Sequence, residues 1–166
     1  VIVCDDADLS ITIPQLLLAK MRNGGAACTA ANRIYVQRPI AEKFISELTK
    51  SMSAFVMGRG TDTSTTLGAS VSMKERNKIA QIVDESVAAG AKVHLGAKLP
   101  DGDGAFYPAT VLGVEKDNPI LNHEIFGPVA PVVIFDTDEE GIALANDTDF
   151  GLISYVFSSS LGRAIH

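Results

Sequence analysis

The sequence has few cysteines, an excess of acidic over basic residues, and no long apolar run. Its 166 residues include two cysteines, Cys4 and Cys28, which are too few for a disulfide framework, so free thiols in a cytoplasmic protein are expected. With 14 Lys and Arg against 20 Asp and Glu, the net charge is −6 and no basic stripe follows the chain. A nucleic-acid partner is therefore not expected. No apolar stretch approaches the roughly 20 residues that a membrane-spanning helix needs, so no membrane association is expected.

The composition predicts one folded domain. A hydrophobic share of 46% and a charged share of 20% are typical of a globular chain that buries a core. The first residues, VIVCDDADLS, lack the features of a secretion signal and are typical of a strand followed by a helix cap. The last residues, LGRAIH, resemble the first turn of a helix without an end. We therefore expect the chain to continue beyond both ends.

Apolar runs alternate with amphipathic segments along the chain. Because the apolar runs are nearly continuous, they fit a parallel sheet that helices cover on both faces. The predicted fold class is α/β with an open, mostly parallel sheet. In the helical segment 9–21, Pro14 could mark the first turn of a helix that starts later. Strands are predicted at residues 1–4, 34–37, 92–95, 129–135 and 152–158, and helices at 9–21, 39–53, 72–89 and 137–146.

The segment NGGAACTAANR, residues 23–33, is small and nearly uncharged. A nucleophilic cysteine needs open space, a lowered thiol pKa and backbone N–H groups that face the oxyanion. Gly24, Gly25 and Ala26 leave the approach to Cys28 uncrowded, and a turn followed by a helix-like stretch would direct free amides toward the sulfur. The alternative is an inert core cysteine among alanines, which is also what Cys4 is expected to be.

The segment HEIFGPVAPVVIF, residues 123–135, predicts a turn that leads into a buried strand. The carboxylate of Glu124 can accept hydrogen bonds from sugar hydroxyls, and the ring of Phe126 can pack against a flat heterocycle. The alternative is a solvated glutamate beside a core phenylalanine. His123 opens another possibility, because a cysteine paired with a histidine is typical of thiol hydrolases and transferases.

The segments 23–33 and 123–135 both resemble sequence signatures of one protein family. Asn23, Gly25, Cys28 and Arg33 fall on the active-site signature of the aldehyde dehydrogenase superfamily, and residues 123–135 are similar to its second signature. The two signatures also stand in the order and at about the separation that the family shows. Residues 90–93, 107–114 and 146–152 also resemble the family, so the resemblance covers essentially the whole chain.

The resemblance implies oxidation of an aldehyde by NAD or NADP, without a metal site. Cys28 would add to the aldehyde to give a thiohemiacetal, then a thioester that water hydrolyses, and the backbone N–H of Cys28 would donate to the oxyanion. Glu124 would hold the nicotinamide ribose, and Phe126 would line the nicotinamide. The resemblance further implies that the full-length enzyme is a homo-dimer or a homo-tetramer.

The resemblance also implies that residues 1–166 are the thiol-bearing catalytic domain, truncated at both ends. The general base and most of the nucleotide-binding domain would lie upstream, so the chain alone is expected to be inactive. One position departs from the pattern: most members have Gln or Glu where this chain has Ala26. That difference leaves open whether activity or access to the thiol is altered.

Arg22 precedes the first signature directly. An arginine there could bind a substrate carboxylate through two parallel hydrogen bonds, or it could be a solvated cation at a helix end. The sequence of this chain resembles the succinate-semialdehyde dehydrogenase branch of the family. In that branch, an arginine at this position binds the distal carboxylate of the substrate. A carboxylated aldehyde is therefore the expected substrate. Two other functions stay open: a thiol hydrolase or acyltransferase built on Cys28 and His123, and a non-catalytic interaction module.

Overall fold

The computed structural model describes residues 1–165, so only His166 of the predicted final helical turn lies outside the described residues. Six strands form one sheet in the order β3-β4-β5-β2-β1-β6. Neighbouring strands are parallel except for β3 and β4. The strands are β1 (Ile2–Val3), β2 (Ile34–Gln37), β3 (Lys92–Leu95), β4 (Thr110–Gly113), β5 (Val129–Phe135) and β6 (Val156–Phe157). The helices are α1 (Leu9–Met21), α2 (Arg38–Ser53), α3 (Met73–Ala88), α4 (Asp138–Asn146) and α5 (Leu161–Ile165), with short 3₁₀ helices η1 (Arg22–Gly25) and η2 (Pro119–Asn122).

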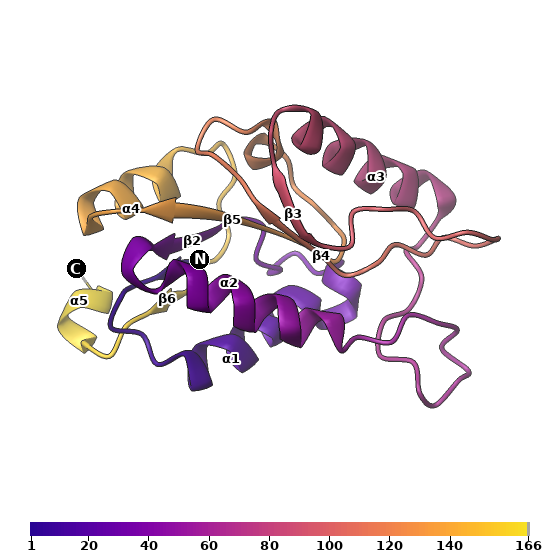
Figure 1. Cartoon of the computed structure of the whole chain (residues 1–166), viewed down its shortest axis with the longest axis horizontal. Coiled ribbons are helices and arrows are strands. Elements are labelled where there is room, and N and C mark those ends of the chain that lie inside the picture. The colour runs from indigo at the N-terminus through magenta and orange to yellow at the C-terminus, as the bar shows by residue number, and fades with distance from the viewer. Residues whose placement is uncertain (166) are drawn as a thin grey trace.

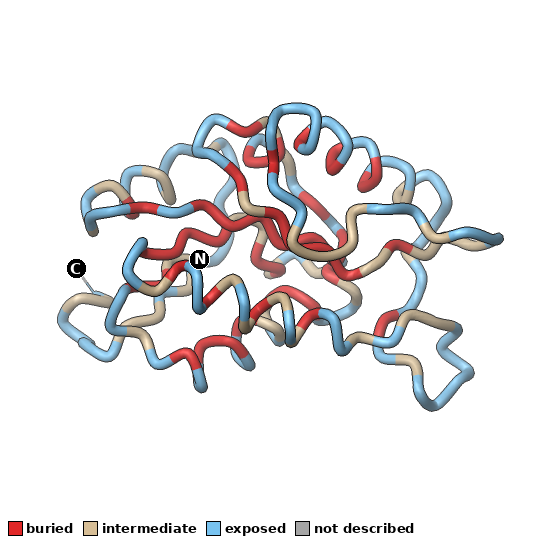
Figure 2. Tube along the Cα trace, in the orientation of Figure 1, coloured by how far each residue is buried: buried red, intermediate tan, exposed pale blue. Residues whose placement is uncertain are grey.

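Helices cover both faces of the sheet: α1 and α2 lie on one face, and α3 and α4 lie on the other (Figure 1). Alternate residues of β2 divide between two core clusters, because successive side chains of a strand point to opposite faces. Ile34 and Val36 belong to the cluster that contains residues of α1 and α2, whereas Tyr35 belongs to the cluster under α3. Figure 2 shows the buried residues along the sheet and on the inner sides of the helices. The predicted α/β class is confirmed.

The start of α1 shows which residue begins the helix. Asp8 is its N-cap and accepts a hydrogen bond from the N–H of Ser10 at 2.9 Å. The helix therefore begins at Leu9, and a start near Pro14 is wrong, because the cap and the buried Leu9 and Ile13 stabilise the turn before the proline. Pro14 lies inside the helix. No helix within residues 1–165 is long and apolar enough to cross a membrane.

Besides β1, which is one residue shorter at each end than the predicted strand 1–4, two strands differ from the sequence prediction. The strand expected over residues 152–158 is confined to Val156–Phe157, because residues 152–154 are exposed and line a cavity, and bonding to β1 starts at the carbonyl of Tyr155. The other difference is β4, which was not predicted and lies between β3 and β5 with three buried residues. Its place depends on its neighbours in the sheet, β3 and β5, with which it pairs.

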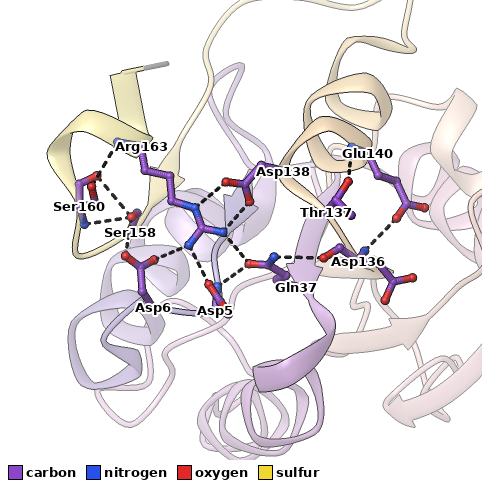
Figure 3. Close-up of polar contacts among 10 residues, drawn as sticks. All are labelled: Asp5, Asp6, Gln37, Asp136, Thr137, Asp138, Glu140, Ser158, Ser160 and Arg163. Carbon is purple, nitrogen blue, oxygen red and sulfur yellow. Dashed lines mark hydrogen bonds and ion pairs between the residues drawn. The ribbon is translucent and has the colours of Figure 1, made fainter.

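A network of charged and polar side chains lies at the carboxyl ends of four parallel strands, β1, β2, β5 and β6 (Figure 3). Arg163 of α5 donates to Asp5 at 2.7 Å and to Asp6 at 3.1 Å, both just after β1. It also donates to Asp138, at the start of α4, and to Gln37, at the end of β2. The hydrogen bond from Arg163 lowers the pKa of Asp138. The guanidinium thus joins α5 to the end of β2 and to the segments that follow β1 and β5.

Candidate active site

A cavity of about 560 Å³ lies at the amino ends of the parallel strands. Its walls come mainly from residues that precede four strands: Val1 before β1, Cys28 and residues 30–33 before β2, Glu124 before β5 and residues 148–155 before β6. Ile142, Ala145 and Asn146 of α4 also line the cavity. Because the strands are parallel, their amino ends meet at one edge. Cys28 and Glu124, which are far apart in the sequence, therefore line the same cavity.

Cys28 lies in a tight turn between α1 and β2. Three residues with positive φ, Asn23 (52°), Gly24 (63°) and Gly25 (79°), reverse the chain after α1. The N–H of Ala30 then donates to the carbonyl of Ala27 at 2.9 Å, which places Cys28 in the middle of the turn. The predicted helix-like stretch after the glycines is therefore wrong: the segment is a single turn.

The side chain and the amide of Cys28 are both available for chemistry. The side chain is exposed, whereas Cys4 is buried, and burial raises the pKa of the Cys4 thiol. Within residues 1–165, the N–H of Cys28 donates to no acceptor. A thiol beside its own free N–H can attack a carbonyl and stabilise the oxygen that becomes negative.

The two conspicuous sequence segments pack directly against each other. A Cβ at Gly25 would collide with the backbone carbonyl of Gly127. The N–H of Ile125 donates to the side chain of Asn32 at 3.2 Å, and Nε of Arg33 donates to the carbonyl of Leu121 at 2.7 Å. These contacts hold the Cys28 segment and the Glu124 segment together.

Replacing Gly25 by alanine should lower the free energy of unfolding by about 3 kcal/mol, because a methyl group both collides with backbone and disfavours the positive φ. Urea unfolding of the variant measures this loss. The matched control is Gly90→Ala, since Gly90 also has a positive φ but has nothing within 4 Å of the added Cβ. It should lose only about 1–2 kcal/mol. Equal losses at the two positions would show that the contact with Gly127 is not tight.

Glu124 and Phe126 have different surroundings. Glu124 is exposed and lines the cavity, and Ile125 is buried with 1% of its surface exposed. Phe126 is 42% exposed but does not line the cavity. The described structure therefore places Glu124 in the same cavity as Cys28 and leaves the ring of Phe126 outside it.

Arg22 and His123 do not line the cavity either. Arg22 is exposed at the junction of α1 and η1. His123 is half-buried, and within residues 1–165 no hydrogen bond joins it to Cys28. The structure thus gives no contact for a Cys28/His123 pair. Ala26, where the family pattern has Gln or Glu, is exposed next to the turn.

The side chains of Tyr155 and Phe150 stabilise the wall of the cavity, and the sequence did not indicate either of them. Tyr155 lines the cavity and donates its hydroxyl to the carbonyl of Thr29 at 3.0 Å. Phe150 places its ring centroid 5.4 Å from the guanidinium of Arg33, a cation–π contact. Both aromatic residues belong to the loop before β6. No local pattern marks them, since each contact joins residues more than 100 positions apart.

The model of the aldehyde dehydrogenase family matches residues 1–166. A succinate-semialdehyde dehydrogenase of Paenarthrobacter nicotinovorans is 42% identical over 165 residues, which are 99% of this chain and 37% of that protein.

Two solved structures are similar to this chain over 99% of its length. Lactaldehyde dehydrogenase from Escherichia coli has a TM-score of 0.95 at 37% identity, and the match covers 35% of that chain. A betaine aldehyde dehydrogenase double mutant from Staphylococcus aureus, in complex with NAD+, has a TM-score of 0.93 at 37% identity, with 34% of that chain covered. The present chain spans about a third of the length of these relatives.

Proposed function

Because the chain belongs to the aldehyde dehydrogenase family, we propose that Cys28 is the nucleophile of an aldehyde oxidation that depends on NAD or NADP. The observation that carries this proposal is the cavity at the amino ends of the strands, which Cys28 and Glu124 line together. The exposed thiol has room for a substrate, and the free N–H of Cys28 supplies a hydrogen-bond donor at the point of attack.

In the proposed reaction, the thiolate of Cys28 forms a bond to the carbonyl carbon of the aldehyde. The electron pair of the C=O π bond moves to oxygen, and the N–H of Cys28 donates to this oxyanion. Bound NAD or NADP supplies the hydride acceptor. As the electron pair on oxygen re-forms the C=O bond, the C–H bond of the former aldehyde breaks and its hydride leaves to this acceptor, so that Cys28 carries the acyl group as a thioester. Water then attacks the thioester, and the acid leaves as the C–S bond breaks.

Glu124 at the cavity wall and Phe126 just outside the cavity fit part of a nicotinamide nucleotide. The carboxylate of Glu124 is exposed at the cavity wall, where it can accept hydrogen bonds from ribose hydroxyls. Phe126 is exposed two residues later and offers an aromatic face to the nicotinamide. The NAD+ in the related betaine aldehyde dehydrogenase structure supports this class of cofactor. We assign Glu124 to the ribose and Phe126 to the nicotinamide as part of the proposal.

We further propose that residues 1–166 are the thiol-bearing part of a longer enzyme. The chain spans 37% of the related succinate-semialdehyde dehydrogenase, so most of a complete enzyme has no counterpart here. The general base and most of the nucleotide-binding domain would belong to the remainder, and the isolated chain would oxidise no aldehyde. We propose a cytoplasmic homo-dimer or homo-tetramer, in keeping with the free thiols of Cys4 and Cys28.

For the substrate, we propose a carboxylated aldehyde such as succinate semialdehyde. The similarity to a succinate-semialdehyde dehydrogenase supports this choice, whereas the similarity to a lactaldehyde dehydrogenase shows that the fold alone does not select it. Arg22 is the proposed determinant, because its exposed guanidinium can form two parallel hydrogen bonds with a carboxylate.

The full-length polypeptide should oxidise succinate semialdehyde with NAD or NADP, and Arg22→Ala should raise KM for this substrate by roughly tenfold to a hundredfold. Loss of a charge-assisted pair costs about 1.5–3 kcal/mol, which corresponds to that range. The measurement is the rate of NAD(P)H formation for succinate semialdehyde and for an apolar aldehyde of similar length.

The matched control is Arg59→Ala, which removes another exposed arginine from the loop between α2 and α3. It should leave both KM values within twofold. An equal rise in KM for both aldehydes in Arg22→Ala would refute the substrate assignment. Absence of aldehyde-dependent NAD(P)H formation by the unmodified polypeptide would refute the proposed function itself.

A further inference from the structure

The turn that carries Cys28 has few hydrogen bonds. Residues 26–33 form no helix or strand. Within the turn, the N–H of Ala30 donates to the carbonyl of Ala27 at 2.9 Å, and just after it the N–H of Ala31 donates to Ala19 of α1 at 3.2 Å. Ala30 and Ala31 are buried, whereas residues 26–29 are exposed or half-buried. The orientation of the part that carries Cys28 therefore depends on a small number of contacts.

Tyr155 makes one of these contacts from the loop before β6, which also lines the cavity. Its hydroxyl donates to the carbonyl of Thr29 at 3.0 Å, across 126 positions of sequence. Within residues 1–165, no other side chain donates to the backbone of residues 27–30. Tyr155 and Cys28 both line the cavity, so this hydrogen bond spans part of its wall.

The backbone of Tyr155 is itself fixed to the sheet. Its carbonyl accepts a hydrogen bond from the N–H of Ile2 at 2.9 Å, and the next residue, Val156, pairs with Ile2 in the parallel ladder of β1 and β6. A ring held at a strand end is a more rigid support than a loop side chain. The Cys28 turn is thus tied to the sheet through a short aromatic side chain.

The hydrogen bond acts on the peptide group between Thr29 and Ala30, one residue beyond Cys28. The carbonyl of Thr29 and the N–H of Ala30 belong to one planar peptide group. Tyr155 holds the carbonyl, and Ala27 holds the N–H, so the plane is restrained at both ends. This restraint holds the turn in its present conformation. In that conformation the N–H of Cys28 has no hydrogen-bond partner within residues 1–165, so it is free to donate to an oxyanion.

We infer that Tyr155 is a positioning residue that holds the Cys28 turn in its reactive form through the carbonyl of Thr29. The inference rests on the proposed function. Tyr155 touches neither the sulfur nor the reacting atoms in this role; it fixes the backbone that carries them.

The test is Tyr155→Phe in the full-length polypeptide, which removes the hydroxyl and keeps the ring. Hydrogen exchange of the peptide that covers residues 26–31 should become roughly fivefold to twentyfold faster, because one restraint of the turn is lost. The kcat for aldehyde oxidation should fall by about tenfold, while KM stays within twofold, because the substrate pocket is kept and only the geometry of attack is loosened.

Tyr107→Phe is the control, since Tyr107 is a buried tyrosine in the core under α3 and does not line the cavity. It should leave kcat and the exchange of residues 26–31 within twofold. The inference is overturned if Tyr155→Phe leaves either quantity unchanged, or if the control lowers kcat equally. If the unmodified polypeptide oxidises no aldehyde, the proposed function fails, and the exchange rates alone decide whether Tyr155 holds the turn.

Discussion

Replacing Cys28 by serine in the full-length polypeptide should lower kcat for aldehyde oxidation by on the order of 10⁴-fold or more. A hydroxyl of similar size occupies the same turn, but at neutral pH it is far less ionised than a thiol and a weaker nucleophile. Without the covalent adduct, no thioester forms, and the reaction loses its intermediate. The rate of NAD(P)H formation with saturating succinate semialdehyde measures the effect.

Cys4→Ser is the matched control, because it makes the same chemical change at the other cysteine. Cys4 has 4% of its surface exposed and does not line the cavity, and burial raises the pKa of its thiol. This variant should keep kcat within twofold per folded molecule, although burial of a hydroxyl in place of a thiol lowers stability. Retained activity in Cys28→Ser, or an equal loss in the two variants, would contradict the assignment of the nucleophile.

Replacing Lys20 by methionine should raise the free energy of unfolding at pH 7 by about 4 kcal/mol. Lys20 lies in the last turn of α1 with 1% of its surface exposed, and within residues 1–165 its Nζ has no hydrogen-bond partner. Burial lowers the pKa of this ammonium from 10.5 to about 7. Methionine has a side chain of similar length and no charge, so its burial avoids the free-energy cost of desolvating an ammonium group.

The lowered pKa of Lys20 also sets the direction in which its effect on the free energy of unfolding changes with pH. Between pH 7 and pH 10.5, the unfolded chain keeps the proton of Lys20, whereas the folded chain has released it. The unfolded state therefore binds more protons, and Lys20 makes the protein more stable as the pH rises, by about 1.4 kcal/mol per pH unit. Below pH 7 the penalty is constant. The advantage of Lys20→Met should accordingly be largest at and below pH 7 and should shrink toward pH 10.5.

Urea unfolding of both proteins at several pH values measures this difference. Lys50→Met is the control, because Lys50 also lies in the last turn of a helix, α2, but is exposed. Its free energy of unfolding should change by less than about 0.5 kcal/mol at every pH. A difference between Lys20→Met and the unmodified protein that did not vary with pH would show that Lys20 stays charged in the folded state.

Much of the fold could be predicted from the sequence because its elements have a strong local pattern. The strands at 34–37, 92–95 and 129–135 have the predicted bounds. The helices α3 and α4 each begin one residue after the predicted start, because Ser72 and Thr137 act as N-caps. The strand β4 and the shortness of β6 could not be predicted, since each depends on its neighbours in the sheet.

The candidate site, like the fold, could be predicted from the sequence only in part. The two signatures marked Cys28 and Glu124, because the residue types around a reactive thiol and a buried strand are local properties of the chain. The sequence could not show that both line one cavity, since this depends on the parallel pairing that brings the amino ends of the strands together. Nor could it show that Phe126 and Arg22 lie outside that cavity.

The sequence by itself therefore determined the α/β class, most of the strands and helices, the family and the candidate nucleophile, because periodicity and short motifs need only neighbouring residues. The tertiary structure decided the environment of each group. It placed Lys20 in the core although its position at a helix end favours solvent, and it joined Tyr155 to the turn of Cys28. Burial and long-range hydrogen bonds arise only when distant segments pack, so no local pattern encodes them.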